Sequence, residues 1–192
     1  MATERLFYAL DLADEVVDRL QSLQEAFAAE VPDPVNIRWT PPENMHLTLK
    51  FLGSQEAELA EEFGVVMDEL AGGLAPFEMT LQNVGAFPHP RHPRILWVGV
   101  DLESAERLAE LHRRLEERLE AYDVDRDEHA FKAHVTFGRI KSSNAPKLSS
   151  VESALPSGPF GTTAVDEILL YESELSPDGS TYTLRHRSPL GG

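Results

Sequence analysis

Met45-His46-Leu47-Thr48-Leu49-Lys50-Phe51-Leu52-Gly53 is the stretch around which the rest of the chain is best understood. Apolar and polar residues alternate in it and β-favouring residues dominate, which predicts a half-buried strand. Side chains alternate between the two faces of a strand, so His46 and Thr48 share one face, about 7 Å apart along the chain. We expect Leu47, Leu49 and Phe51 to point the other way, into a core.

The same pattern returns at Ala133-His134-Val135-Thr136-Phe137-Gly138-Arg139. The composition gives roughly 0.3 His-x-Thr triplets by chance, and two occur, each on an apolar β-type segment in the matching place of its half. We therefore predict an internal duplication, with residues 1–192 forming one domain of two interleaved lobes. The expected fold class is α+β and bilobal: two antiparallel-sheet lobes with helices outside, related by a pseudo-twofold axis around a central cleft.

Hydrophobic periodicity and turn residues predict the elements along the chain. We expect strands at 5–12, 37–40, 45–53, 77–87, 95–102, 131–140, 165–172 and 182–187. We expect helices at 14–30, 55–70 and 103–122. Segments rich in Pro, Gly or Ser predict turns or loops at 31–34, 88–93, 141–161 and 176–179, with one helical turn near 148–155.

The net charge is −16, from 33 acidic and 17 basic residues. This charge argues against broad non-specific coating of nucleic acid, which needs a basic surface, but it leaves room for a small basic pocket. It fits either a halophile's surface, whose self-repulsion is screened by salt, or an ordinary acidic cytosolic protein. Cysteine is absent, which excludes disulfides, thiolate metal sites and a cysteine nucleophile. Without a signal-peptide pattern or an apolar run of about 18 residues, we expect a cytoplasmic protein that does not contact membranes.

Face-to-face packing of the two lobes would bring four polar side chains together: His46, Thr48, His134 and Thr136. Two imidazoles that titrate near neutrality can share general acid–base work, one protonated and one neutral. Threonine hydroxyls can donate to phosphate oxygens, so this set suits cleavage of a phosphate ester without a metal. Arg139 is the first candidate for a cation that stabilises the developing charge, and Lys132 and Lys50 are weaker candidates.

Other interpretations of the histidines stay open at this point. A lone histidine on a strand usually satisfies hydrogen bonds in a core, whereas a matched pair of motifs favours a catalytic role for the two histidines. A metal site would need a third protein ligand, which the pattern does not supply. The remaining histidines are expected at the surface: His89, His92, His112, His129 and His186.

The two H-x-T-x motifs resemble those of the 2H phosphoesterase superfamily. Flanking segments are similar to its RNA 2′,3′-cyclic phosphodiesterase branch, the LigT/ThpR type also called 2′-5′ RNA ligase. These segments are Arg5 to Leu12 (RLFYALDL), Asn44 to Gly53 (NMHLTLKFLG), Phe131 to Arg139 (FKAHVTFGR) and Leu170 to Leu175 (LYESEL). One departure is Ala133, where the branch often has proline; it does not touch the chemistry.

The resemblance implies a bilobal α+β fold that hydrolyses a terminal RNA 2′,3′-cyclic phosphate to a 2′-phosphomonoester. His46 would donate a proton to the departing 3′-oxygen, and His134 would accept a proton from the attacking water. Run backwards, the same site would join RNA ends through a 2′-5′ linkage. No metal or nucleotide cofactor is implied, and the expected partner is RNA with cyclic-phosphate ends, with tRNA halves as one candidate. We also expect a monomer.

Two further interpretations remain beside this one. The chain could be a non-catalytic module that binds RNA or nucleotides, or a 2H enzyme for another small cyclic phosphate. The presence of both motif histidines favours an enzyme, but the motifs do not reveal the rest of the substrate pocket. Phe7 and Tyr171 are candidates for stacking on a terminal base, although aromatic residues on strands more often belong to the core.

Overall fold

The computed structural model describes residues 3–31, 35–141, 147–148, 158–177 and 179–191. In chain order its elements are β1 (Thr3–Asp11), α1 (Asp14–Glu30), β2 (Ile37–Trp39), the short 3₁₀ helix η1 (Pro42–Asn44), β3 (His46–Glu56), α2 (Leu59–Ala71), β4 (Phe77–His89), β5 (His92–Val100), α3 (Leu102–Leu119), β6 (His134–Ile140), β7 (Gly161–Val165), β8 (Glu167–Ser176) and β9 (Gly179–Pro189). The predicted α+β class is confirmed. None of the described helices is long and apolar enough to cross a membrane.

The described strands form one nine-stranded sheet in the order β7-β4-β5-β6-β3-β1-β8-β9, with β2 paired to β6. All of its pairings are antiparallel. The two halves meet at the motif strands β3 and β6, which are joined through Leu47 and Val135. In each half a helix connects two paired strands, β1 to β3 through α1 and β5 to β6 through α3. Both motifs therefore lie at the centre of a continuous sheet.

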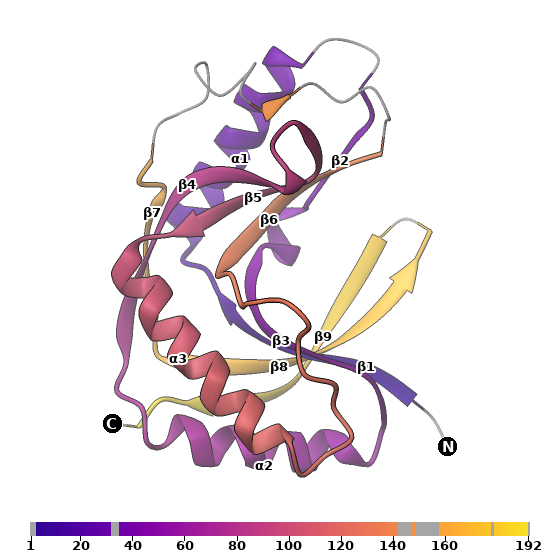
Figure 1. Ribbon diagram of the computed structural model, residues 1–192, viewed down its shortest axis with the longest axis vertical. Helices are drawn as coiled ribbons and strands as arrows, with labels where there is room; N and C mark the ends of the chain where they lie inside the picture. The colour runs from indigo at the N-terminus through magenta and orange to yellow at the C-terminus, as the bar shows by residue number, and fades with distance from the viewer. Residues whose placement is uncertain (1–2, 32–34, 142–146, 149–157, 178, 192) are drawn as a thin grey trace.

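The helices cover the outside of this sheet (Figure 1). Helix α1 packs against β6 and β7, whereas α2 packs against β8 and β9 and lies beside α3. The apolar residues between and after the motif residues are at most 1% exposed and belong to the core: Leu47, Leu49, Val135 and Phe137. Each such side chain contributes about 1.5–3 kcal/mol of burial free energy. The polar motif residues are thereby directed to the opposite face.

Several boundaries differ from the sequence prediction because strands pair further than their local pattern shows. Strand β3 continues to Glu56, so α2 begins at Leu59 and not near 55. Strands β4 and β5 continue to His89 and His92, so most of the predicted loop 88–93 is the end of a hairpin. Strand β7 was not predicted; it pairs with β4. The second motif strand begins at residue 134, not 131.

The C-terminal hairpin agrees with the turn predicted at 176–179, because Ser176 pairs with Gly179. Its strands are longer than expected, since β8 ends at 176 and β9 runs from 179 to 189. The turn at 31–34, the residue 178 and the helical turn near 148–155 lie wholly or mostly outside the described residues.

Candidate active site

The pairing of β3 with β6 gathers the polar residues of both motifs. Leu47 and Val135 are direct antiparallel partners and fully buried, so their neighbours in the chain project to the opposite face. The register sets each motif histidine opposite the threonine of the other motif. Directly opposed residues lie about 5 Å apart and diagonal ones about 7–8 Å, a separation that one phosphate group can bridge. We call these four residues the motif quartet: His46, Thr48, His134 and Thr136.

Aromatic rings enclose His46 at the start of β3. Its ring stacks on Phe7 at 5.0 Å, and Tyr182 of β9 meets it edge-on at 5.1 Å. Its Nε2 lies 3.1 Å from Thr48 Oγ1. Burial lowers the pKa of His46 to about 4, although a backbone hydrogen bond with Asn44 acts in the opposite direction. The free imidazole is therefore neutral at pH 7, and a bound phosphate anion would favour its protonated form.

His134 has a comparable aromatic setting in the other half. Phe87 lies edge-on at 5.0 Å, and Trp97 is 6.2 Å away. Its Nδ1 is 2.6 Å from the Lys132 carbonyl oxygen, which can only accept, so Nδ1 carries the proton and Nε2 keeps a free lone pair. Burial lowers the pKa of His134; the carbonyl opposes this, while the charges of Lys132 and Arg139 add to the lowering. A neutral imidazole with a free Nε2 is suited to accept a proton.

Two of the three candidate cations lie near His134. Arg139 and Lys132 are exposed, and both charges act on its imidazole. The Lys132 ammonium also lies 4.1 Å over the Trp97 ring, a cation–π contact that fixes its place. The prediction of Lys50 as a candidate cation for the phosphate is wrong. Lys50 is 2% exposed, and it pairs with carboxylates of α3 and of the segment that follows α3.

Each motif strand has a bulge directly after its threonine. The pairing of β1 with β3 passes over Leu49, and the pairing of β5 with β6 passes over Phe137. A bulge shifts the alternation of faces, so the fifth residue after each histidine returns to the polar face. In the second motif this residue is Arg139; in the first it is Phe51, which is 61% exposed. The prediction that Phe51 enters the core is therefore wrong, and the same shift buries Lys50.

The other histidines lie outside the motif quartet. Three of them are exposed, as expected: His89, His92 and His129. His186 is half-exposed and pairs with Asp68 of α2. The predicted surface position is wrong for His112, which is 8% exposed, because α3 turns it inward to Asp127.

Stacking on a terminal base would require exposed rings on Phe7 and Tyr171, and neither ring is fully exposed. Phe7 is 1% exposed, so its ring supports His46 from within the protein. Tyr171 is half-buried, stacks on Phe7 at 5.6 Å, and donates its hydroxyl to Asp11. Both residues thus form part of the wall behind His46.

The sequence did not indicate three aromatic residues of this site: Phe87, Trp97 and Tyr182. They come from β4, β5 and β9, which carry no motif. Strand pairing brings them beside the histidines, and pairing between distant strands is not visible in a local pattern. The available signal was Trp97 within the predicted strand 95–102, and a tryptophan there fits a core position equally well.

A family model described as LigT like phosphoesterase matches residues 10–97 and, separately, 98–182. Each matched range contains one His-x-Thr motif and one of the two motif strands. The two matches together span most of the chain, so the similarity is not confined to the motifs.

Several relatives match this chain over most of its length. An RNA 2′,3′-cyclic phosphodiesterase of Methanothermobacter thermautotrophicus is 34% identical and covers 93% of this chain and 95% of its own. The crystal structure of TT0787 of Thermus thermophilus has a TM-score of 0.81 at 30% identity, covering 98% of both chains. Escherichia coli LigT complexed with 3′-AMP shares the fold, with a TM-score of 0.76, 24% identity and 100% of both chains covered. The chain therefore belongs to the LigT-like phosphoesterase family of the 2H superfamily.

Proposed function

We propose that this protein hydrolyses the 2′,3′-cyclic phosphate at the end of an RNA to a 2′-phosphomonoester, as a cytoplasmic monomer without a metal. The observation that carries the proposal is the motif quartet, in which the register of β3 and β6 sets each histidine opposite the other motif's threonine. The name shared by its relatives, RNA 2′,3′-cyclic phosphodiesterase, supports the substrate class. Both halves of the chain contribute to this one site.

The proposed reaction divides its proton transfers between the two imidazoles. His134 Nε2 takes a proton from water as the water oxygen attacks phosphorus. His46 gives a proton to the 3′-oxygen as the bond from phosphorus to that oxygen breaks, which leaves the phosphate on the 2′-oxygen. Thr48 and Thr136 donate hydrogen bonds to phosphate oxygens, and Arg139 offsets the charge that develops on them. Each positioned acid or base is worth about 10²–10⁴-fold in rate.

The same geometry supports a parallel transesterification that joins two RNA ends. A 5′-hydroxyl in the place of water would lose its proton to His134 and attack the cyclic phosphate. The 3′-oxygen would leave as before, and the two RNA ends would be joined through a 2′-5′ phosphodiester. Ligation therefore needs no residue beyond those of hydrolysis.

The experiment is product analysis with an oligonucleotide that ends in a 2′,3′-cyclic phosphate, beside tRNA halves and a cyclic mononucleotide. We expect a 2′-phosphate product and an unchanged rate in EDTA. A 3′-phosphate product would contradict the assignment of His46 to the 3′-oxygen, and a rate lost in EDTA and restored by a divalent ion would contradict the metal-free mechanism. Binding without turnover would indicate the non-catalytic alternative.

The acidic surface leads to a second measurement in this assay, the activity at high salt. We propose that the net charge of −16 suits the protein to high salt, where the screening length falls from about 10 Å at 0.1 M to about 3 Å at 1 M. Activity is therefore expected to persist in molar KCl. Loss of activity there, with full activity at low salt, would contradict the salt adaptation and leave the catalytic proposal standing.

A further inference from the structure

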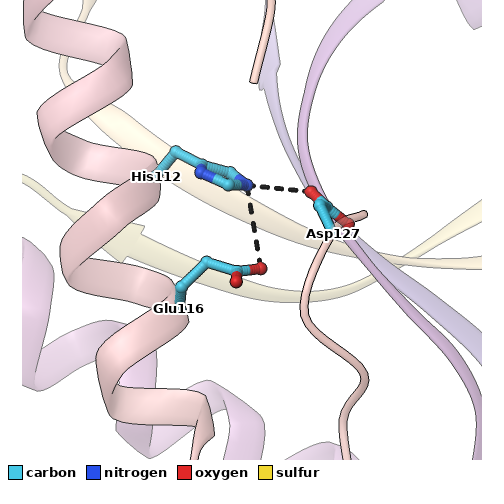
Figure 2. Close-up of side chains that lie close together, drawn as sticks. All are labelled: His112, Glu116 and Asp127. Atoms are coloured by element: carbon cyan, nitrogen blue, oxygen red, sulfur yellow. Dashed lines mark hydrogen bonds and ion pairs between the residues drawn. The ribbon is translucent and has the colours of Figure 1, made fainter. Parts of the chain in front are cut away.

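A second group of charged side chains meets on the core side of β3, outside the motif quartet. Lys50 is 2% exposed, and its ammonium pairs with Glu116 of α3. The ammonium nitrogen also lies 2.8 Å from Asp127 Oδ1 and 2.8 Å from the Asp125 carbonyl oxygen. The other carboxylate oxygen of Asp127 lies 2.9 Å from His112 Nε2 (Figure 2). The ammonium thus donates hydrogen bonds to Asp127 and to the Asp125 carbonyl oxygen, and Glu116 adds an ion pair.

Three side chains of this group could ligate a metal ion, and the Lys50 ammonium already pairs with two of them, Glu116 and Asp127. Figure 2 shows His112, Glu116 and Asp127 turned toward one another, and their ligand atoms lie within 4.8 Å. Such a set suits a divalent cation. Burial raises the pKa of Asp127, but hydrogen bonds from Lys50 and His112 outweigh it and hold that pKa below its usual range. The group is a buried ion-pair network, which we call the Lys50 network.

The Lys50 network connects the two motifs. Lys50 lies two residues after the threonine of the first motif, whereas Asp127 belongs to the segment 120–133 that leads into the second. His112 holds Asp127 and stacks flat on Phe131, with ring centroids 4.4 Å apart and an angle of 13°. The residue after Phe131 supplies the carbonyl oxygen that binds His134 Nδ1 at 2.6 Å. Direct contacts thus run from the strand of one histidine to the backbone that orients the other.

We propose that Lys50 is a positioning residue for His134, acting through Asp127, His112 and Phe131. Its ammonium fixes the segment 120–133 against β3, and the segment presents the carbonyl that sets the tautomer and direction of the imidazole. The two histidines then keep the separation that one phosphate requires. This inference rests on the proposed function.

A purely structural role for Lys50 leads to different results. Removing one partner of a buried ion pair leaves uncompensated charge and destabilises a protein whatever its function. Stability alone therefore does not separate the two roles. A structural role predicts that the folded fraction of a variant keeps its kcat, its pH profile and the titration of His134, and a positioning role predicts that all three change.

The experiment compares Lys50→Met with Lys50→Arg, which keeps the charge. We expect Lys50→Met to lower kcat by about 10²-fold with little change in KM, since a misplacement of about 1 Å can cost that much. The kcat of Lys50→Arg should be at least tenfold higher than that of Lys50→Met. By NMR, the His134 imidazole in Lys50→Met should titrate closer to the ordinary histidine value, because the loosened segment exposes it.

The matched control is Arg118→Met, which breaks the exposed ion pair between α3 and Glu69 of α2 and leaves the Lys50 network intact. It should keep the wild-type kcat and His134 titration. If Lys50→Met does not fold, Asp127→Asn replaces it, because that side chain is 41% exposed and the change is milder. Unchanged kcat and unchanged His134 titration in the folded variant would overturn the inference. Absence of cyclic-phosphate hydrolysis by the wild type would overturn the proposed function, and the NMR comparison would still decide the positioning role.

Discussion

At the scale of single residues, both motif imidazoles are tied to the backbone two positions earlier in the chain. His134 donates to the Lys132 carbonyl, and His46 has a backbone hydrogen bond with Asn44. In His134 this contact engages Nδ1 and leaves Nε2 for the substrate side, whereas Nε2 of His46 lies 3.1 Å from Thr48 Oγ1. The His-x-Thr spacing therefore fixes orientation as well as face. The sequence showed the face through strand alternation, but the backbone contacts depend on the loop before each strand.

The burial of both imidazoles leads to a prediction about pH. Burial lowers the pKa of His46 to about 4 and also lowers that of His134 from 6.5. Below the lower pKa both rings are protonated and no base is present; above the higher one both are neutral and no acid is present. We therefore expect a bell-shaped kcat/KM profile with its maximum below pH 6.5.

The reaction uses the form with His46 protonated and His134 neutral, and a bound phosphate anion beside the buried His46 favours that form. The kcat profile, which reports the complex, should thus lie at higher pH than that of kcat/KM. The measurement is initial rates across the pH range at saturating and at low substrate. A kcat/KM maximum above pH 7 would contradict the assignment of a buried, neutral pair in the free protein.

At the scale of elements, the bulges decide what faces the substrate. Strand alternation alone correctly placed Leu47, Leu49, His46 and Thr48, but it failed from Lys50 onward. The failure has a physical cause: a bulge depends on which strand lies alongside, and here β1 passes over Leu49 of β3 and β5 passes over Phe137 of β6. The partner strands were predicted as strands, but their pairing and register require the whole fold.

The pairing of β4 with β5 leads to a prediction at Gly85. A Cβ there would come within 2.2 Å of the Trp97 ring, which is its direct cross-strand partner. Gly85→Ala should therefore push the indole out of place, together with the Lys132 ammonium and His134 that it contacts. We expect a loss of about 1–3 kcal/mol in unfolding free energy and a fall in kcat of about 10- to 10²-fold.

The control for this variant is Gly73→Ala, since a Cβ at Gly73 meets only the Leu70 carbonyl oxygen, at 3.8 Å. Denaturant unfolding and the rate with a cyclic-phosphate oligonucleotide measure both effects. If Gly85→Ala kept the wild-type kcat, the packing of Trp97 would have no part in holding His134.

At the scale of the whole molecule, the sheet is continuous and the site lies where its two halves meet. The duplication of strand, helix and motif strand was visible in the sequence because both motifs and both helical patterns recur. The joint between the halves of the sheet was not visible, since it is marked by one cross-strand pair of apolar residues, Leu47 and Val135. Nothing in their local pattern distinguishes these residues from other buried strand positions. The central claim is therefore one of cooperation: two histidines from separate halves act on a single phosphate.

The most direct test of that claim measures kcat/KM for His46→Ala, His134→Ala and the double variant on one cyclic-phosphate oligonucleotide, with His129→Ala as an exposed control. Groups that act as a unit in one transition state give non-additive losses. We expect each single variant to lose about 10²–10⁴-fold in kcat/KM. The kcat/KM of the double variant should be less than about tenfold below that of the slower single variant, and the control should match the wild type. A wild-type rate in either single variant, or a double loss equal to the product of the single losses, would contradict the account.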